Sequence, residues 1–120
     1  MRDLVYLLPY PPSLNHLYPT VRGRRMLSVT GRKFKEAVVV AVLSQGRPAK
    51  PLTGRLWYVF RVYPPDRRVR DLSNVVKILE DSLTAAGVWE DDGQVDDQHV
   101  LRMPPTQDGA VEVTVGRLPC

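Results

Sequence analysis

The strongest structural signal in this chain is a regular apolar stripe in its second half. From Leu72 to Ala86 the apolar side chains recur at helical spacing and share one face: Leu72, Val75, Val76, Leu79, Leu83 and Ala86. Gly87 follows at the position where helices often end in a left-handed residue. The stripe predicts an amphipathic helix over Leu72–Ala86 that packs on a sheet. Its opposite face should look outward: Asp71, Asn74, Lys77, Ile78 and Asp81.

A second helix is predicted over Thr30–Ser44, with Ser28 as its N-cap. Helical spacing relates four of its apolar residues: Phe34, Ala37, Val38 and Ala41. The run Val38–Val40 favours a strand instead, because β-branched residues lose rotamer freedom in a helix. We expect the helix, and the strand is the alternative that the sequence leaves open.

Four further segments have the composition of strands: Val5–Leu8, Arg55–Tyr63, Gln98–Met103 and Val111–Val115. Prolines follow the first two and end them, since proline cannot donate to a sheet ladder. We expect Tyr18–Met26 to form a basic loop or hairpin and Gln45–Gly54 a connecting loop. The order strand, helix, strand, helix, strand, strand predicts an α+β fold: a small single domain over residues 1–120, with one mixed sheet and helices on one side.

Charge is divided unevenly along the chain. Residues 1–70 contain 14 Lys/Arg and 3 Asp/Glu, a net charge of +11, whereas residues 71–120 contain 3 and 10, a net charge of −7, and together these give the overall +4. A basic first part suits a polyanion, and 13 Arg against 4 Lys favours bidentate phosphate contacts. This indicates a nucleic-acid partner, although a solvated arginine-rich surface would give the same counts.

Nothing in the sequence indicates a membrane protein or a disulfide-rich one. The longest apolar stretch, Ala37–Leu43, is too short to cross a bilayer, and the N-terminus lacks a signal-peptide pattern. Cys120 is the only cysteine, so an internal disulfide is excluded. We expect a cytoplasmic location. His16 and His99 have no partner at metal-ligand spacing and are interpreted as structural or surface residues.

Eight of the 13 acidic residues lie in one stretch of the chain: Asp71, Glu80, Asp81, Glu90, Asp91, Asp92, Asp96 and Asp97. Hydrolysing a phosphodiester at neutral pH requires an activated nucleophile and neutralisation of the phosphate charge. Mg²⁺ provides both and prefers carboxylate oxygens and waters as ligands. Bringing Asp92 to Asp71 requires the loop and strand after the Leu72–Ala86 helix to run back alongside that helix, which spacing alone does not establish.

Six of these acids also have a purely structural interpretation. Asp71 is a good helix N-cap, and residues 91–93 (Asp-Asp-Gly) have the composition of a turn. Asp81 is placed to pair with Lys77, whose functional interpretation is a cation beside the scissile phosphate. Residues 96–97 resemble surface acids before a strand. The residues alone leave both interpretations open.

Ordered motifs along nearly the whole chain resemble the RusA family of Holliday-junction resolvases. Four segments carry the resemblance: Leu8–Asn15, Ser28–Gly31, Pro65–Asn74 and Gly87–Val95. The third is a basic loop that leads into an Asp-x-Asp-Asn pattern, and the fourth resembles Gly-x-x-x-Asp-Asp-x-Gln-Val. Lys77 and Asp81–Leu83 fall at the family's spacing. Several ordered motifs at matching spacing are far more specific than any one of them.

The resemblance implies a bacterial or phage endodeoxyribonuclease that acts as a homodimer on four-way DNA junctions with Mg²⁺, for which Mn²⁺ is a plausible substitute. It implies that Asp71 and Asp92 bind the metal and are required for catalysis. It also implies that Lys77 is needed for cleavage, that Arg70 contacts DNA, and that Asn15 is the asparagine of the opening motif, which we count with the DNA-binding residues.

Basic residues of the first part should seat the phosphate backbone without reading its sequence: Arg22, Arg24, Arg25, Arg67, Arg68 and Arg70. Because the chain has one acid constellation and a junction must be nicked on two strands, a two-fold dimer is the economical way to supply the second site.

One position departs from the family pattern. Ser73 stands where the pattern has its second aspartate, and a hydroxyl can ligate Mg²⁺ or hold a metal-bound water but brings no charge. We expect weaker metal affinity, with Asp91, Asp97 or Asn74 filling in. The alternative is a branched-DNA-binding protein that cuts poorly or not at all.

Overall fold

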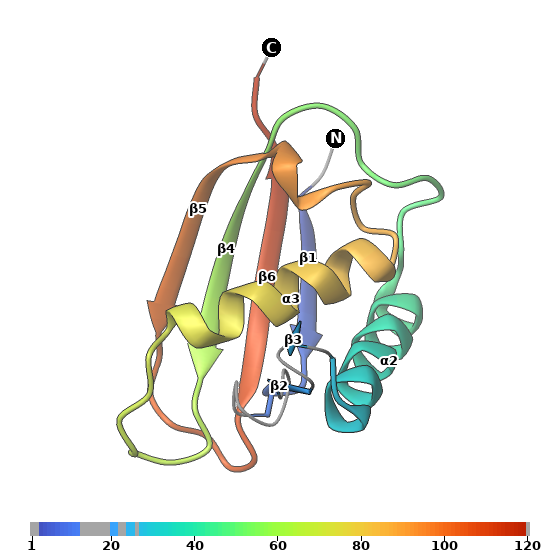
Figure 1. The fold of residues 1–120 in the computed structure, drawn as a ribbon. Coiled ribbons are helices and arrows are strands. Elements are labelled where there is room, and N and C mark those ends of the chain that lie inside the picture. The colour runs from blue at the N-terminus through green and yellow to red at the C-terminus, as the bar shows by residue number, and fades with distance from the viewer. Residues whose placement is uncertain (1–2, 13–19, 22–23, 26, 120) are drawn as a thin grey trace.

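Four strands form one mixed sheet, and two helices of the described part of the chain cover one of its faces (Figure 1). The computed structural model describes residues 3–12, 20–21, 24–25 and 27–119. Its elements are β1 (Leu4–Leu8), β2 (Thr20–Val21), β3 (Arg24–Arg25), α2 (Val29–Gln45), β4 (Leu56–Tyr63), α3 (Ser73–Ala85), the 3-10 turn η1 (Asp92–Gln94), β5 (Val95–Arg102) and β6 (Ala110–Arg117). The sheet order is β1-β6-β4-β5, with β4 and β5 parallel and the other pairs antiparallel. The predicted α+β fold with a mixed sheet is confirmed.

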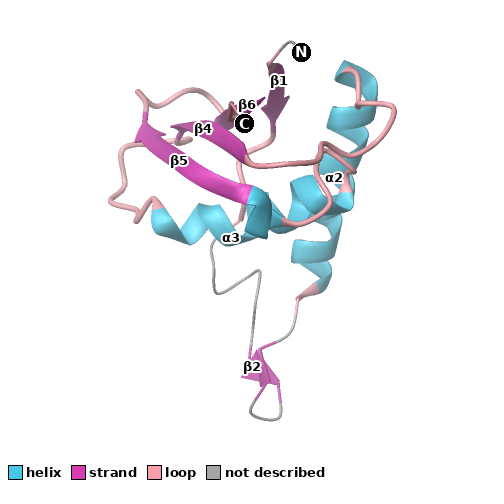
Figure 2. Cartoon of the chain, turned by 90° about the horizontal axis from the view of Figure 1, so that it is seen from above, coloured by secondary structure: helices cyan, strands magenta, loops and turns pink. Residues whose placement is uncertain are grey.

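The parallel pair β4–β5 determines where α3 lies. Parallel neighbours need a crossover connection, and α3 supplies it by crossing the sheet between the end of β4 and the start of η1. Figure 1 shows α3 lying obliquely across the strands, and Figure 2 shows the helices on the same side of the sheet. α2 packs beside α3 and β1. Helices on one side of the sheet were predicted, and this is confirmed.

The core lies between this sheet face and the helices. Side chains alternate along β4, so that every second one is buried: Leu56, Tyr58, Phe60 and Val62. β6 contributes Val111, Val113 and Val115, and β1 contributes Tyr6 and Leu8. The opposite sheet face has no helix over it among the described residues, and its β4 side chains are half-buried.

The helix predicted over Thr30–Ser44 forms as α2, so the strand alternative for the run Val38–Val40 is wrong. Ser28 is its N-cap, as predicted, and its Oγ accepts the N–H of Gly31 at 2.9 Å. The buried residues are Gly31, Phe34, Val38 and Val42. Ala37, expected in the apolar face, is exposed, because the buried row advances by four residues from Phe34.

The stripe-bearing helix forms as α3, with one error in its predicted face. It begins at Ser73, one residue later than expected, and Gly87 follows its end with φ +81°, as predicted. Ile78, expected on the outward face, is fully buried. The cause is that α3 packs against α2 as well as the sheet, which widens the buried arc.

β5 begins at Val95, three residues before its predicted start at Gln98. Asp96 and Asp97 therefore lie within the strand, which corrects the expectation that they precede it. They are tolerated because β5 is an edge strand, where charged side chains can stay in water. Arg55 pairs with Asp96, its Nε donating to Oδ2 at 2.7 Å.

Within the predicted basic loop or hairpin, β2 and β3 pair as a two-stranded hairpin. Figure 2 shows β2 well away from the sheet. Four residues singled out in the sequence lie outside the described ones: Asn15, His16, Arg22 and Cys120. The side chains of Arg24 and Arg25 are also outside the described part of the structure. Among the described helices, none is both long and apolar enough to cross a membrane.

Candidate functional site

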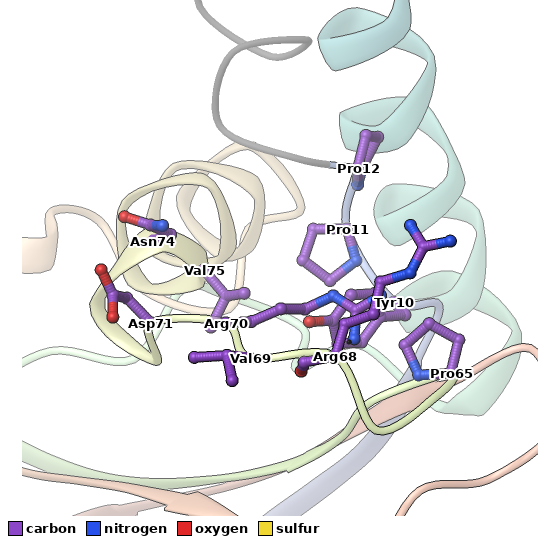
Figure 3. A pocket seen from close by; sticks show the side chains of 10 residues that line it. All are labelled: Tyr10, Pro11, Pro12, Pro65, Arg68, Val69, Arg70, Asp71, Asn74 and Val75. Carbon is purple, nitrogen blue, oxygen red and sulfur yellow. Dashed lines mark hydrogen bonds between the residues drawn. The ribbon is translucent and has the colours of Figure 1, made fainter.

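Two hollows flank α3, and between them they contain most of the predicted site residues that the structure describes. The arginine hollow, of about 620 Å³, lies at the N-terminal end of α3 and is lined by Tyr10, Pro11, Pro12, Pro65, Arg68, Val69, Arg70, Asp71, Asn74 and Val75 (Figure 3). The acid hollow, of about 320 Å³, lies beside the C-terminal half of α3 and is lined by Lys35, Asp81, Thr84, Ala85, Asp91 and Asp92.

The 3-10 turn η1 places Asp91 and Asp92 at the acid hollow. Asp91 is its N-cap, and its Oδ1 accepts the N–H of Gly93 at 3.3 Å. Gln94 closes the turn, since its Oε1 accepts the N–H groups of Glu90 and Asp91, each at 2.9 Å. The turn interpretation of this segment is thus correct as local structure, and it is the turn that presents both carboxylates.

Gln94 also anchors η1 to the loop before β4. Its Nε2 donates to the carbonyl oxygens of Leu52 at 2.9 Å and Gly54 at 3.0 Å. On the other side of the turn, the buried Trp89 donates from Nε1 to Thr84 Oγ1 on α3 at 2.7 Å. The two anchors fix η1 against α3 and against the loop, and sequence analysis assigned neither role.

The pKa of Asp92 is raised. Burial is the largest cause, followed by a hydrogen bond to the Asp91 carboxyl and by the negative charges of Asp91 and Asp81, while Lys77 lowers it. Lys77 Nζ lies 3.5 Å from Asp81 Oδ2, which is the ion pair that the sequence suggested as the structural interpretation of Asp81. Asp92, Asp91, Asp81 and Lys77 therefore form one electrostatic group.

Glu80 extends this group and was not identified as a site residue from the sequence. Its Oε2 accepts the hydroxyl of Tyr58 at 2.9 Å, and burial together with Asp92 and Asp81 raises its pKa. The same hydroxyl lies 2.9 Å from Gln98 Oε1, although it has one proton to donate. Rotating the Gln98 amide, so that its NH₂ faces the hydroxyl, satisfies all three groups. The apolar helix stripe gave no signal for Glu80, because it lies at the edge of the buried arc.

Lys35 is a second residue that sequence analysis missed. It comes from α2 and lines the acid hollow with Asp81 and Asp92. Its position depends on the packing of α2 against α3, which no local pattern records.

The arginine hollow is built on a braced loop. Arg70 Nη1 donates to Asp66 Oδ1 at 2.6 Å, and the backbone N–H of Arg68 donates to the same oxygen at 2.9 Å. These contacts hold the pKa of Asp66 at about 2, with the Arg70 hydrogen bond as the main cause. Arg102, at the end of β5, donates from Nη2 to the carbonyl of Arg70 at 2.6 Å. Arg70 is therefore fixed, whereas the Arg68 side chain is 83% exposed.

Asp71 is exposed at the rim of the arginine hollow and does not cap α3. The cap position belongs to Leu72, and no side-chain hydrogen bond caps the helix. The N-cap interpretation of Asp71 is wrong. Figure 3 shows Asp71 and Asn74 together at the start of α3. An exposed carboxylate that does not serve the helix is available for another partner.

The structure does not bring Asp71 and Asp92 into one hollow. The chain does run back along α3, as their pairing requires, but Arg102 at the far end of β5 is what reaches Arg70. Asp92, at the start of that return, lies with Asp81, ten residues and about 15 Å of helix from Asp71. A shared metal site for Asp71 and Asp92 stays a prediction.

The acid hollow has the donor chemistry for a divalent cation. Within residues 3–12 and 27–119, no cluster of three or more His, Cys, Asp or Glu side chains has the geometry of a metal site. Mg²⁺ is commonly held by one or two carboxylates plus waters and substrate phosphates. Asp91 and Asp92 meet closely enough to hydrogen-bond, and a cation between two such carboxyls would relieve their repulsion.

A family model described as endodeoxyribonuclease RusA matches residues 9–116. The chain belongs to the RusA family. Its relatives include the crossover junction endodeoxyribonuclease RusA of Shigella sonnei strain Ss046 and that of Escherichia coli K12, each 41% identical over 112 residues, which is 90% of this chain and 89% of the relative. The protein of the same name from Enterobacteria phage 82 is 40% identical over the same shares.

Ser73 and the residues expected to compensate for it in this RusA-family chain lie in different parts of the fold. Ser73 is the first residue of α3 and is exposed, next to Asn74 in the arginine hollow. Asp97 lies on β5 opposite Trp57, on the sheet face away from the helices, with its Oδ1 3.0 Å from His99 Nε2. Of the residues expected to compensate for Ser73, Asn74 and Asp91 are on the helix side and Asp97 is not. His99 is an exposed surface residue, as predicted.

Proposed function

We propose that this chain is a metal-dependent endodeoxyribonuclease that resolves four-way DNA junctions by paired symmetric nicks. The observation that carries the proposal is 41% identity, over 90% of the chain, to proteins named crossover junction endodeoxyribonuclease. The two hollows support it, because one gathers carboxylates and the other gathers arginines along the same helix.

In this proposal the arginine side seats the DNA backbone. Arg67 and Arg68 are exposed, and their charges are available to phosphates, while the Asp66–Arg70 contact keeps their loop in one conformation. Such contacts should make junction binding fall steeply with salt. Arg70 would then contribute mainly by holding the loop and placing its partly covered guanidinium at the hollow.

Asp71, at the start of α3, and Asp92, with Asp91 beside it, would each bind Mg²⁺ or Mn²⁺ in the complex with DNA. When bound, the ion would lower the pKa of a water and offset charge on the scissile phosphate. Lys77, one helical turn from Asp81 and exposed, adds a positive charge for the oxygen that leaves. A homodimer would supply the second such site for the second strand.

A second candidate function follows from Ser73. A site with a hydroxyl in place of a carboxylate attracts a cation less strongly, so a branched-DNA-binding protein that cuts weakly or not at all is the alternative.

The experiment that separates them uses a labelled four-way junction with Mg²⁺ or Mn²⁺. We expect paired nicks from the unmodified chain. Asp71→Asn should keep junction affinity but lose activity by more than the roughly 10–100-fold that changes beside metal ligands cost. Asp3→Asn, the same substitution at an exposed residue before β1, is the control and should cut normally. Junction binding without nicks in the unmodified chain would favour the binding protein.

A further inference from the structure

We propose that the arginine hollow receives one unstacked base from the branch point of the DNA junction. This rests on the proposed junction substrate and gives a further role to a hollow whose rim also carries Asp71 and the arginines that the proposed function uses. The composition of the hollow is mixed in a way that phosphate contacts alone do not require. Prolines and Tyr10 form one wall, and guanidinium groups lie beside them (Figure 3).

The size and the polar groups suit a nucleotide. A volume of about 620 Å³ lies within the roughly 300–1,000 Å³ of sites that hold small organic molecules. Proteins that take up single unpaired bases stack them on aromatic rings or arginine planes and hydrogen-bond their edges. Tyr10 and Arg70 provide such a platform, with the Arg70 Cζ 5.9 Å from the ring centroid. Asn74 provides an amide at the rim.

Tyr10 is held in place before any ligand arrives. Gly109, with φ +68°, lies so close that a Cβ there would be 2.9 Å from Tyr10 Cβ, and Arg70 is fixed over the ring by Asp66. Glycine is the residue that allows both this backbone conformation and this close approach. A preformed platform lowers the entropy cost of ordering a base on it.

Val69 is the least expected residue of the rim. It is 97% exposed, between Arg68 and Arg70. A single exposed apolar residue needs no explanation by itself, but this one stands beside two cations at the mouth of an apolar hollow. A base that enters the hollow would cover it, and this would bury apolar surface that water otherwise contacts.

The branch point is where a base is most easily supplied. Taking a base out of a duplex costs a few kcal/mol, and the cost is least where pairing or stacking is already interrupted. A four-way junction has such an interruption at its crossover, and its arms do not. The hollow would therefore favour branched DNA over a duplex of the same sequence.

The first test observes the hollow directly in the unmodified protein. Valine methyl groups are labelled, and their NMR signals are followed as junctions are added in EDTA, so that nothing is cut. One junction is intact, and others carry an abasic site at each nucleotide flanking the crossover in turn. We expect ring-current shifts at Val69 and Val75 with the intact junction, lost at one abasic position. Val40, exposed on α2, is the control methyl.

The second test is a double-mutant cycle between protein and DNA. Tyr10→Ala should weaken binding of the intact junction roughly tenfold, the value of one base–aromatic stack, and should not weaken binding of the critical abasic junction further. Tyr10→Phe should retain affinity. A deoxynucleoside monophosphate, added alone, shows whether a free nucleotide suffices; shifts at Val69 with it at equal concentration would overturn the assignment to the branch point.

The two proposals fail differently. If the protein prefers the junction over a duplex and nicks it, but the valine shifts ignore every abasic site, the base site is wrong and the proposed function stands. Equal losses from Tyr10→Ala on intact and abasic junctions would also exclude the base site alone. If the protein shows no preference for four-way DNA at all, the proposed function fails, and the base site with it.

Discussion

Ser73 stands at the first residue of α3, one position before Asn74 and two after Asp71. All three are exposed at the same end of the helix, so a carboxylate at Ser73 would face the same solvent as Asp71. Two carboxylates within one turn attract a divalent cation more strongly than one, because ligand charge is a main determinant of affinity. The hydroxyl therefore leaves this end of the helix with a single negative charge.

Replacing Ser73 by aspartate should restore that charge. We expect Ser73→Asp to lower the Mg²⁺ concentration for half-maximal junction cleavage by on the order of tenfold, with little change in junction affinity. A metal-binding isotherm and a cleavage titration measure it. Ser44→Asp, at an exposed serine in α2, is the matched control. An isotherm that does not tighten would count against the idea that Ser73 weakens the site.

Glu80 permits a pH prediction. Burial first, and then Asp92 and Asp81, raise its pKa above the ordinary 4.5. A carboxyl with a raised folded-state pKa costs stability once the pH exceeds its unfolded value, and the cost is absent below that value. Glu80→Gln keeps an oxygen that accepts from Tyr58 and removes the charge. It should raise the melting temperature by a few degrees at pH 7 and leave it unchanged at pH 4.

The control for that comparison is Glu36→Gln, an exposed glutamate on α2. Its melting temperature should follow that of the unmodified chain at both pH values. Equal stabilisation by Glu80→Gln at pH 4 and pH 7 would contradict the charge explanation, because the carboxyl is mostly protonated at the lower pH in both states.

At the scale of elements, the helices and strands with a regular apolar pattern were predictable from the sequence. The elements that pack against them in the fold were not. The spacing of Leu79 and Leu83 and the stop at Gly87 located α3 to within one residue at each end. The same spacing placed Ile78 outside, since a single-helix pattern cannot show that α2 covers that side. The apolar pattern of a helix therefore indicates the face that packs on one partner, but it does not show where a second partner covers the helix.

The candidate site was predictable to the same extent: its residues could be identified, but their neighbours in the fold could not. Sequence motifs identified Asp71, Asp92 and Lys77 by type and spacing, but did not show that Asp71 and Asp92 line separate hollows. Whether Asp92 or Arg102 reaches the start of α3 depends on the register of β5 against β4, which is set by tertiary pairing. Lys35 could not be found at all, because it lies in α2 outside the only motif of that helix, Ser28–Gly31.

β4 and β6 meet closely on the sheet face away from the helices. Gly116 pairs with Trp57, and a Cβ at Gly116 would lie 2.6 Å from the indole ring. Gly116→Ala therefore forces the ring to move. We expect it to destabilise the fold by about 1–3 kcal/mol, as overpacking does, measured by chemical unfolding.

A second substitution tests that cause. Trp57→Leu removes the ring that the new methyl would meet, so Gly116→Ala should cost much less in the Trp57→Leu background than in the unmodified chain. Costs that simply add would show that Gly116 matters for a reason other than its contact with Trp57.

For the whole molecule, the fold mixes charges that the sequence keeps apart. Lys35, from the basic part, lines the acid hollow, and Arg102, from the acidic part, supports the arginine hollow. Each hollow contains side chains of both charges, because Asp71 lies with the arginines and Lys35 lies with the acids. The arginine hollow and the acid hollow of a single chain thereby lie along the same helix, one at the start of α3 and one beside its C-terminal half.

One chain offers one such arrangement, and resolving a junction requires two cuts. If two copies each cut one strand, a dimer with one inactive copy should nick and not resolve. Unmodified and Asp71→Asn chains with different tags can be co-expressed and the mixed dimer isolated. On a supercoiled plasmid with an extruded cruciform, the unmodified dimer should give linear product by cutting both strands within one encounter. The mixed dimer should give mainly nicked circles.

A dimer of two unmodified chains with the same two tags is the control, and it should linearise the plasmid. Linear product at the control rate from the mixed dimer would mean that one copy makes both cuts, and the symmetric arrangement would then be wrong. The absence of any mixed species, at concentrations where the junction is cut, would point to a chain that acts alone. If the mixed dimer gives nicked circles and the control gives linear product, then resolution requires two copies, each of which makes one cut that depends on Asp71.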